Sequence, residues 1–577
     1  YFRYLILTLT ITSFFQIPDF LFAQQFGPGA GPGPVAGVAQ TTLTTFETAD
    51  FSGSGICAMC HSGLTDEATP TPNDVSNDAH WRSTMMANAA KDPLWQAKIS
   101  TEVQLVDNPI LKQAIQEKCS RCHMGMARYQ QLADGATKDD IYVLDTGFLD
   151  PTHDLHEAAM DGVSCTLCHQ VQPDGLGDPS TYTGQYFIDT DTLPPNREIF
   201  GPYQNPFGNS MQQASGFNPK IGDQIEDPAH CGSCHTLYTP VLDAGGNQVL
   251  DPDTGEYAEF PEQTTYLEWE HSGFAKTCQG CHLPEAVGSV VISNRPRRLP
   301  ARTPFYQHHF VGGNSFMVGL LRDNADVLGV TADPGHLKDT IDRTQALLAG
   351  QTAELTVTPE RAGNLLTVTV DVVNSAGHKL PSGLPSRRVW LHLVVTDASQ
   401  KTIFESGRPL TGGRIEGNDA ENPGNTSLSY EPHYDTIKSA DQVQIYEPIM
   451  YTYEGTTGGY DEVTYTLLRA YSYKKDNRLL PAGFDKGDAH EDIAVYGLAQ
   501  EDGNFIGGSD EVTYEIDVTG ASGALDITVR LLYQTLSKPF VDDLANTNTE
   551  LVDSFMGMYS QTANDPVVLA SVQPPVE

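Results

Sequence analysis

The feature that most constrains this chain is a five-residue motif that occurs five times and uses every cysteine. Each copy reads Cys-x-x-Cys-His, and the 577-residue chain contains 10 cysteines. Two thiols at this spacing, followed at once by histidine, are typical of covalent haem c attachment, in which the imidazole binds the iron. Zinc also binds Cys-x-x-Cys pairs, but it does not require the histidine that follows all five pairs here. The cysteine pairs are Cys57 and Cys60, Cys119 and Cys122, Cys165 and Cys168, Cys231 and Cys234, and Cys278 and Cys281.

The five motifs therefore predict five covalently attached haem c groups, each with a proximal histidine on its iron. These histidines are His61, His123, His169, His235 and His282. If every thiol is bound to haem, none remains for a disulfide.

The N-terminal residues predict export. An apolar run at 4–15 follows Arg3, and Ala23 stands at a suitable cleavage position. We interpret 1–23 as a signal peptide. An uncleaved membrane anchor is the alternative, although the run is short for a membrane span. Because haem c is attached outside the cytoplasmic membrane of bacteria, we expect a periplasmic or extracellular protein with no membrane span after signal removal.

The charge balance limits the classes of partner. The chain has 74 acidic and 34 basic residues, a formal net charge of −40. Such a surface repels nucleic acid and anionic membranes and favours basic redox partners or cations. Solubility alone is the alternative explanation.

The composition divides the chain into successive regions and predicts an α+β multidomain fold. Apolar residues at helical spacing predict helices over 81–106, over 111–119 and over 337–348, the last closed by Gly350. Short helices and loops are expected to wrap the haems. The regions are 1–23 (signal peptide), 24–50 (Gly/Pro-rich linker), 51–335 (pentahaem cytochrome c domain), 336–350 (connecting helix) and 351–577 (β-sandwich).

The last region contains no cysteine and alternates apolar with polar residues. This pattern, rich in β-branched and aromatic residues, predicts an independent, haem-free, all-β sandwich. The expected strands are 354–358, 365–373, 389–396, 443–446, 463–469, 512–518 and 525–533.

Several segments resemble a family of bacterial exported multihaem c-type cytochromes. The haem domain of that family is related to the hydroxylamine oxidoreductase/tetrahaem cytochrome superfamily, and a β-sandwich follows it. The resemblance implies fold, export and electron transfer, but no substrate. The matching segments are 81–88, 161–169, 231–239, 262–269, 309–314, 377–388 and 475–481.

A second axial ligand on each iron separates an electron carrier from a catalyst, because an open iron can bind substrate. Met85 and Met86 compete with His80 for one such position, although a place in a helix core is the alternative for both. We slightly favour His308 over its neighbour by resemblance. The candidate distal ligands are His80, His153, His156, His230, His271, His308, His309 and, from the sandwich, His378.

The leading functional hypothesis is electron relay between partner proteins, among them other cytochromes. One alternative is a redox enzyme acting on a small nitrogen or sulfur compound at an open haem, and another is a subunit of a conductive filament or homo-oligomer. No catalytic residue is assigned. The segment 251–255, Asp-Pro-Asp-Thr-Gly, has the beginning of a Ca²⁺ loop, and a hairpin turn is the competing interpretation.

Overall fold

The computed structural model describes residues 42–575, apart from 67, 69–72, 422–428 and 454–461. All of these belong to one compact unit, residues 40–577. The signal peptide expected at 1–23 and most of the linker expected at 24–50 lie outside the described residues. The fold is α+β, as the sequence predicts. None of the helices in the described part of the chain is long and apolar enough to cross a membrane.

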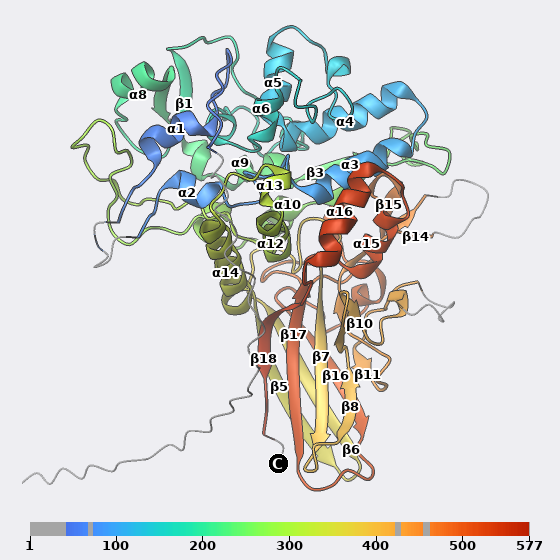
Figure 1. Cartoon of the computed structure of the whole chain (residues 1–577). Coiled ribbons are helices and arrows are strands. Elements are labelled where there is room, and N and C mark those ends of the chain that lie inside the picture. The colour runs from blue at the N-terminus through green and yellow to red at the C-terminus, as the bar shows by residue number, and fades with distance from the viewer. Residues whose placement is uncertain (1–41, 67, 69–72, 422–428, 454–461, 576–577) are drawn as a thin grey trace, which may run out of the picture. The chain divides into compact units, whose positions relative to one another are not determined.

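The motif-bearing region consists mainly of short helices (Figure 1), with two small strand pairs and several isolated bridges between them. Strand β1 pairs with β2 in parallel, and β3 pairs with β4 antiparallel. The elements are α1 (Ser54–His61), α2 (Asn77–Trp81), α3 (Pro93–Gln104), α4 (Pro109–His123), α5 (Gly125–Ala133), α6 (His156–Met160), α7 (Cys165–Cys168), β1 (Arg197–Gly201), α8 (Gly208–Ser215), β2 (Phe217–Ile221), α9 (Pro228–His235), β3 (Leu237–Pro240), β4 (Glu259–Gln263), α10 (Thr265–Ser272), α11 (Cys278–His282), α12 (Ser315–Asp323) and α13 (Ala325–Leu328).

Four helices begin at an Asp-Pro or Asn-Pro step. The side chain of the first residue accepts a backbone N–H of the first turn, and proline takes a position whose own N–H has no partner within the helix. Helices α4 and α9, which carry the second and fourth motifs, both start this way. The caps are Asp92 on α3, Asn108 on α4, Asp227 on α9 and Asp333 on α14 (Pro334–Gln351).

The same step explains why the helix expected over 81–106 is wrong as a single element. The structure has α2, a run of turns, and then α3. Pro93 restricts Asp92 to an extended conformation (ψ 111°), so a helix cannot run through it. The helix expected over 111–119 lies inside α4. Helix α14 contains the predicted 337–348, but it continues through Gly350 to Gln351.

Two sheets dominate the C-terminal region, and Figure 1 shows their long strands alongside one another. One sheet has the order β11-β16-β6-β5; the other has the order β12-β7-β17-β18, with β8 paired to β7. A three-stranded sheet has the order β14-β13-β15. The strands are β5 (Ala353–Ala362), β6 (Leu365–Asn374), β7 (Arg388–Asp397), β8 (Thr402–Ser406), β9 (Pro409–Leu410), β10 (Arg414–Ile415), β11 (Thr436–Ile437), β12 (Ile445–Tyr446), β13 (Pro448–Thr452), β14 (Val463–Thr464), β15 (Ala470–Asp476), β16 (Ser509–Asp517), β17 (Leu525–Gln534) and β18 (Val567–Val572).

Alternate residues of these strands are buried in one core, which is why the period-2 pattern located the long strands. Val368 and Val370 of β6 share this core with Leu391 and Leu393 of β7 and with Val529 of β17. The all-β expectation misses two helices, α15 (Lys538–Ala545) and α16 (Glu550–Gln561). The strand expected over 463–469 is only β14, followed by a 3-10 turn at Leu467–Arg469.

A second hydrophobic core is built from both regions. Leu94 of α3, Phe260 of β4 and Leu320 of α12 pack in one cluster with Tyr473 of β15 and Phe555 of α16. The C-terminal region therefore buries apolar surface against the motif-bearing region as well as within itself.

Candidate functional site

Four of the five motif histidines are held by the same hydrogen bond. In each, Nδ1 donates to a backbone carbonyl oxygen, which leaves Nε2 as the lone-pair nitrogen. This is the tautomer that an iron ligand needs, and the carbonyl also fixes the orientation of the ring. The pairs are His61 with Ile292 (2.7 Å), His123 with Ala89 (2.9 Å), His169 with Phe200 (2.7 Å) and His282 with Val311 (2.6 Å).

The fifth motif histidine, His235, instead makes a hydrogen bond with the side chain of Gln263. Burial lowers the pKa of all five imidazoles, to about 4 for His123. The histidines are therefore neutral at pH 7, in the form that binds a metal ion. These donors fit the haem attachment that the sequence predicts.

The five motifs are in contact with one another, although they are far apart in the sequence. The thiol of Cys57 in the first motif contacts Cys165 in the third, Cys122 in the second contacts Cys234 in the fourth, and Cys231 in the fourth contacts Cys278 in the fifth. His230 connects the third motif to the fourth, because its Nε2 lies 3.1 Å from Sγ of Cys168. Every motif thus touches at least one other, and the fourth motif is central. The ten thiols are all free in the structure.

The adjacent residues His308 and His309 have different neighbours. The ring of His308 faces that of His169, with 6.2 Å between centroids and 22° between planes. The ring of His309 makes an edge contact with His80, with centroids 4.5 Å apart and planes at 78°.

The two histidines before the third motif are in opposite tautomers. His156 donates from Nδ1 to the carbonyl oxygen of Phe148 (2.9 Å), as the motif histidines do. His153 instead accepts the N–H of Leu155 at Nδ1 (3.1 Å), which places its proton on Nε2. Both line a cavity of about 370 Å³ with Phe46, Glu47, Thr48 and neighbouring residues. Because its proton is on Nδ1 and its lone pair is on Nε2, His156 is the better ligand candidate of the two.

The hydrogen bond of His271 is also unfavourable for binding iron. Its Nε2 lies 3.0 Å from the carbonyl oxygen of Asp485, so Nε2 carries the proton and donates it. A nitrogen engaged in this way has no lone pair for iron.

His378 belongs to a loop of the C-terminal region that is fixed against helix α10. Its Nδ1 donates to the carbonyl oxygen of Lys379 (2.8 Å), and it is a neighbour of both His235 and His282. A Cβ on Gly377 would lie 2.6 Å from the ring of Phe274. The loop therefore approaches the fourth and fifth motifs closely, and a distal ligand at His378 would require this approach.

A cluster of four buried charges holds this loop. Glu268 of α10 pairs with Arg478 (2.8 Å), Arg478 pairs with Asp476 (2.7 Å), and Asp476 pairs with Lys379 (2.7 Å). All four side chains are at most 4 % exposed. Glu268 also accepts the backbone N–H of Lys379 (3.1 Å) and the hydroxyl of Ser382 (2.6 Å). No pattern in the sequence predicts this cluster, although Glu268, Lys379 and Arg478 lie in segments that carry the family resemblance.

Two further predictions from the sequence concern Met85 and the loop at 251–255. Met85 packs against two apolar clusters, but it lies in the turns between α2 and α3 and not in a helix. In the loop at 251–255, Asp251 Oδ1 accepts the backbone N–H groups of Asp253 and Thr254 (2.9 and 2.8 Å), and the strand-like bridge between Leu250 and Tyr257 closes a hairpin.

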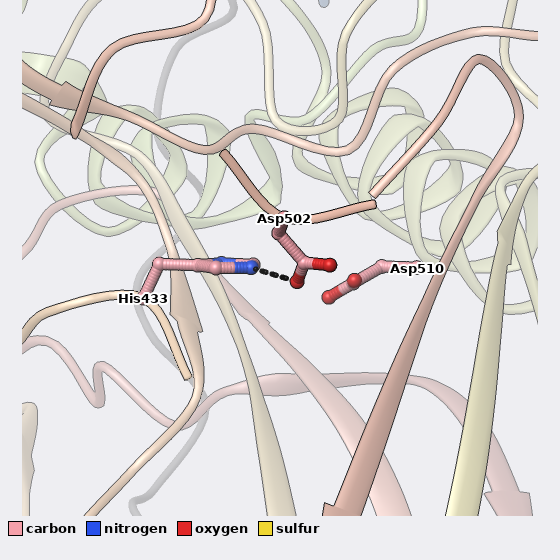
Figure 2. A group of neighbouring side chains, drawn as sticks. All are labelled: His433, Asp502 and Asp510. Carbon is pink, nitrogen blue, oxygen red and sulfur yellow. Dashed lines mark hydrogen bonds and ion pairs between the residues drawn. The ribbon is translucent and has the colours of Figure 1, made fainter. Parts of the chain in front are cut away.

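One further group has the composition of a metal site. His433, Asp502 and Asp510 bring their donor atoms within 4.8 Å of one another (Figure 2). Nδ1 of His433 accepts amide N–H groups from Gln444 (2.8 Å) and Asn477 (3.0 Å). Both amides are oriented by their oxygens, which accept the backbone N–H groups of Tyr434 and Glu447, respectively.

The proton of His433 is therefore on Nε2, which donates to Asp502 (3.0 Å). Burial lowers the pKa of this imidazole to about 4 and raises that of Asp510 to about 7. A cation would need a lone pair on Nε2, but this nitrogen carries the proton that is donated to Asp502. His433, Asp502 and Asp510 therefore do not fit a metal ligand set. Nothing near His433 in the sequence signals this arrangement.

Comparisons with known proteins give one structural likeness. No family model matches the chain, and no curated protein matches it. The structure of a penta-heme cytochrome c552 from Thermochromatium tepidum aligns with a TM-score of 0.48 and 17% sequence identity, over 91% of this chain and 98% of that one.

Proposed function

We propose that this chain is an exported pentahaem c-type cytochrome that relays electrons through closely spaced haems to redox partner proteins. The observation that carries the proposal is the contact network among five complete attachment motifs. If each motif holds a haem, neighbouring macrocycles are attached at touching points of the chain, and electrons can pass between them. The carbonyl-bound tautomers of four motif histidines support iron ligation independently of the cysteines.

The protein's part in this activity is to hold each iron in a fixed environment. Axial ligands, hydrogen bonds to them and burial set the reduction potentials. Here the backbone carbonyls of Ile292, Ala89, Phe200 and Val311 orient the proximal rings. A periplasmic or extracellular location is part of the proposal, because a signal peptide is expected at 1–23.

Haem content tests the proposal directly. The protein should be expressed in a host that attaches haem c, and its intact mass should exceed the polypeptide by five haem equivalents. The matched control is the double variant Cys231→Ala/Cys234→Ala, which should carry four. Fewer than five haems on the unmodified protein, or zinc in the Cys-x-x-Cys pairs, would contradict the proposal.

The spin state then separates the carrier from an enzyme. Electron paramagnetic resonance of the oxidised protein should show low-spin haems. A stoichiometric high-spin haem that binds cyanide, nitrite or hydroxylamine rapidly would favour the redox enzyme instead.

A further inference from the structure

The facing rings of His169 and His308 are separated by the distance that one metal ion would require. A metal–imidazole bond of about 2 Å, plus about 1.1 Å from nitrogen to ring centre, places two imidazoles on opposite sides of one ion about 6 Å apart. The observed separation of the centroids is 6.2 Å. Two rings packed directly against each other come closer, as His80 and His309 do at 4.5 Å.

Hydrogen bonds give both rings the tautomer that this arrangement needs. Nδ1 of His169 donates to the carbonyl oxygen of Phe200 (2.7 Å), and Nδ1 of His308 donates to that of Tyr306 (3.2 Å). Each ring therefore keeps its lone pair on Nε2. Phe200 also donates its own N–H to the carbonyl of His169 (2.7 Å), so β1 holds the third motif in place through two hydrogen bonds.

His230, which lies beside the third motif, does not compete for this position. His230 Nε2 contacts Sγ of Cys168. In an attached haem c, that sulfur is bonded to a vinyl-derived carbon at the edge of the macrocycle, away from the axial direction of the iron.

We propose that His169 and His308 are the two axial ligands of the third haem, which rests on the pentahaem function proposed above. The same short segment also serves the fifth motif. Phe310 donates its N–H to the carbonyl of His282 (3.0 Å), and Val311 accepts the Nδ1–H of that histidine (2.6 Å). Residues 308–311 thus connect the third iron to the proximal ligand of the fifth. The third haem is six-coordinate and acts as a relay, with no axial position left for a substrate.

The variant His308→Gly tests this pairing in the full-length, haem-loaded protein. One haem in five should become high-spin and bind cyanide, and added imidazole should restore the low-spin signal. In a Cys165→Ala/Cys168→Ala background, which lacks the third haem, His308→Gly should produce no new high-spin haem. The matched control is His309→Gly, at the neighbouring residue. Any spectral change that it causes should still appear in the Cys165→Ala/Cys168→Ala background, because His309 is not a ligand of the third haem in this pairing.

Retention of five low-spin haems in His308→Gly would overturn the pairing, as would a high-spin haem that appears without the third attachment site. If the His308→Gly protein does not accumulate, the His308→Met protein should accumulate, because methionine can also bind the iron. In this variant the third haem should stay low-spin and the reduction potential of one haem should rise. A His308→Met protein with five unchanged potentials would also overturn the pairing. Intact mass is measured on each protein, so failure of the pentahaem proposal itself is seen separately, as a haem count below five before any substitution.

Discussion

At the residue scale, a single hydrogen bond distinguishes histidines that have the same sequence context. His153 and His156 lie three residues apart, yet only His156 has Nδ1 on a carbonyl and Nε2 free. His378 passes the same test, and His271 does not. Residue type and position placed all four in one candidate set, whereas the backbone around each determines which ring nitrogen carries the proton.

Glycines inside two motifs allow a matched test of packing at the attachment sites. A Cβ on Gly232 would lie 2.6 Å from the ring of Tyr266, whereas one on Gly280 would meet nothing closer than 3.4 Å. Gly232→Ala should lower the free energy of unfolding by about 1–3 kcal/mol, because the aromatic ring must move. Gly280→Ala should stay within about 1 kcal/mol of the parent, since alanine is the better helix former.

Urea denaturation of the two haem-loaded variants, followed by Soret absorbance, measures both effects. Equal midpoints for the two variants would contradict the close approach of Tyr266 to helix α9.

At the scale of elements, helix α10 and the loop after β6 are joined by charged side chains that are almost completely buried. Burial of an ion pair is favourable only when each charge keeps its partners. Glu268 is 0 % exposed and accepts from Arg478, Ser382 and the backbone of Lys379. The loop that presents His378 therefore depends on a residue of the motif-bearing region.

Glu268→Gln should destabilise the protein by about 3–5 kcal/mol, because it leaves a buried guanidinium partly unpaired. The control is Glu416→Gln, which removes an exposed partner of Arg408 (side chains 51 % and 49 % exposed) and should change stability by about 0–1 kcal/mol. Urea midpoints at pH 7 measure both. A Glu268→Gln midpoint equal to that of the control would show that the cluster contributes little.

The decrease of the free energy of unfolding at acidic pH should depend on the same cluster of buried charges. Arg478 and Lys379 hold the pKa of Asp476 at about 2 against its burial, below the ordinary 3.8. A depressed carboxyl pKa stabilises the fold above pH 4, and this contribution is lost as the pH falls toward 2.

At the scale of the whole molecule, the described residues do not separate into two independent cores. Leu94, Phe260 and Leu320 pack with Tyr473 and Phe555 across the boundary expected near residue 350. Hydrogen bonds cross it too: the side-chain carboxylate of Glu102 accepts the backbone N–H groups of Leu467 (3.2 Å) and Leu468 (3.3 Å).

A fragment of residues 351–577 should therefore be less stable than the same residues in the full chain. Cutting at 350 exposes one side of the shared core, and each Å² of apolar surface left in water costs about 25 cal/mol. The expected result is a colourless, β-rich fragment that binds a hydrophobic dye and unfolds at a lower temperature than the full chain. Co-expression with residues 42–350 is the control and should restore the midpoint. A fragment that unfolds cooperatively at the temperature of the full chain would instead support the expectation of an independent domain.

The local features of this protein can be predicted from its amino-acid sequence. Cys-x-x-Cys-His places three donors within about one helical turn, so attachment can be predicted without knowledge of the fold. The long strands β6 and β16 were predictable for a similar reason, since a strand with one buried face must alternate, whereas β7, whose first six residues are all buried, shows a run of apolar residues. The Asp92-Pro93 break was also present in the sequence, but the apolar spacing on both sides obscured it.

Which residues meet is visible only once the chain is folded. His308 faces His169, His309 contacts His80, and Glu268 pairs with Arg478 because distant segments pack together. Such pairings depend on loop paths and on the tautomer that each backbone carbonyl selects, and neither has a period that a single sequence reveals. The short strands β13 and β15 escaped prediction because they pack in the core that is shared with the motif-bearing region. Helices α15 and α16 bury apolar residues at helical spacing, so their pattern was present in the sequence, but the all-β interpretation of this region passed over it.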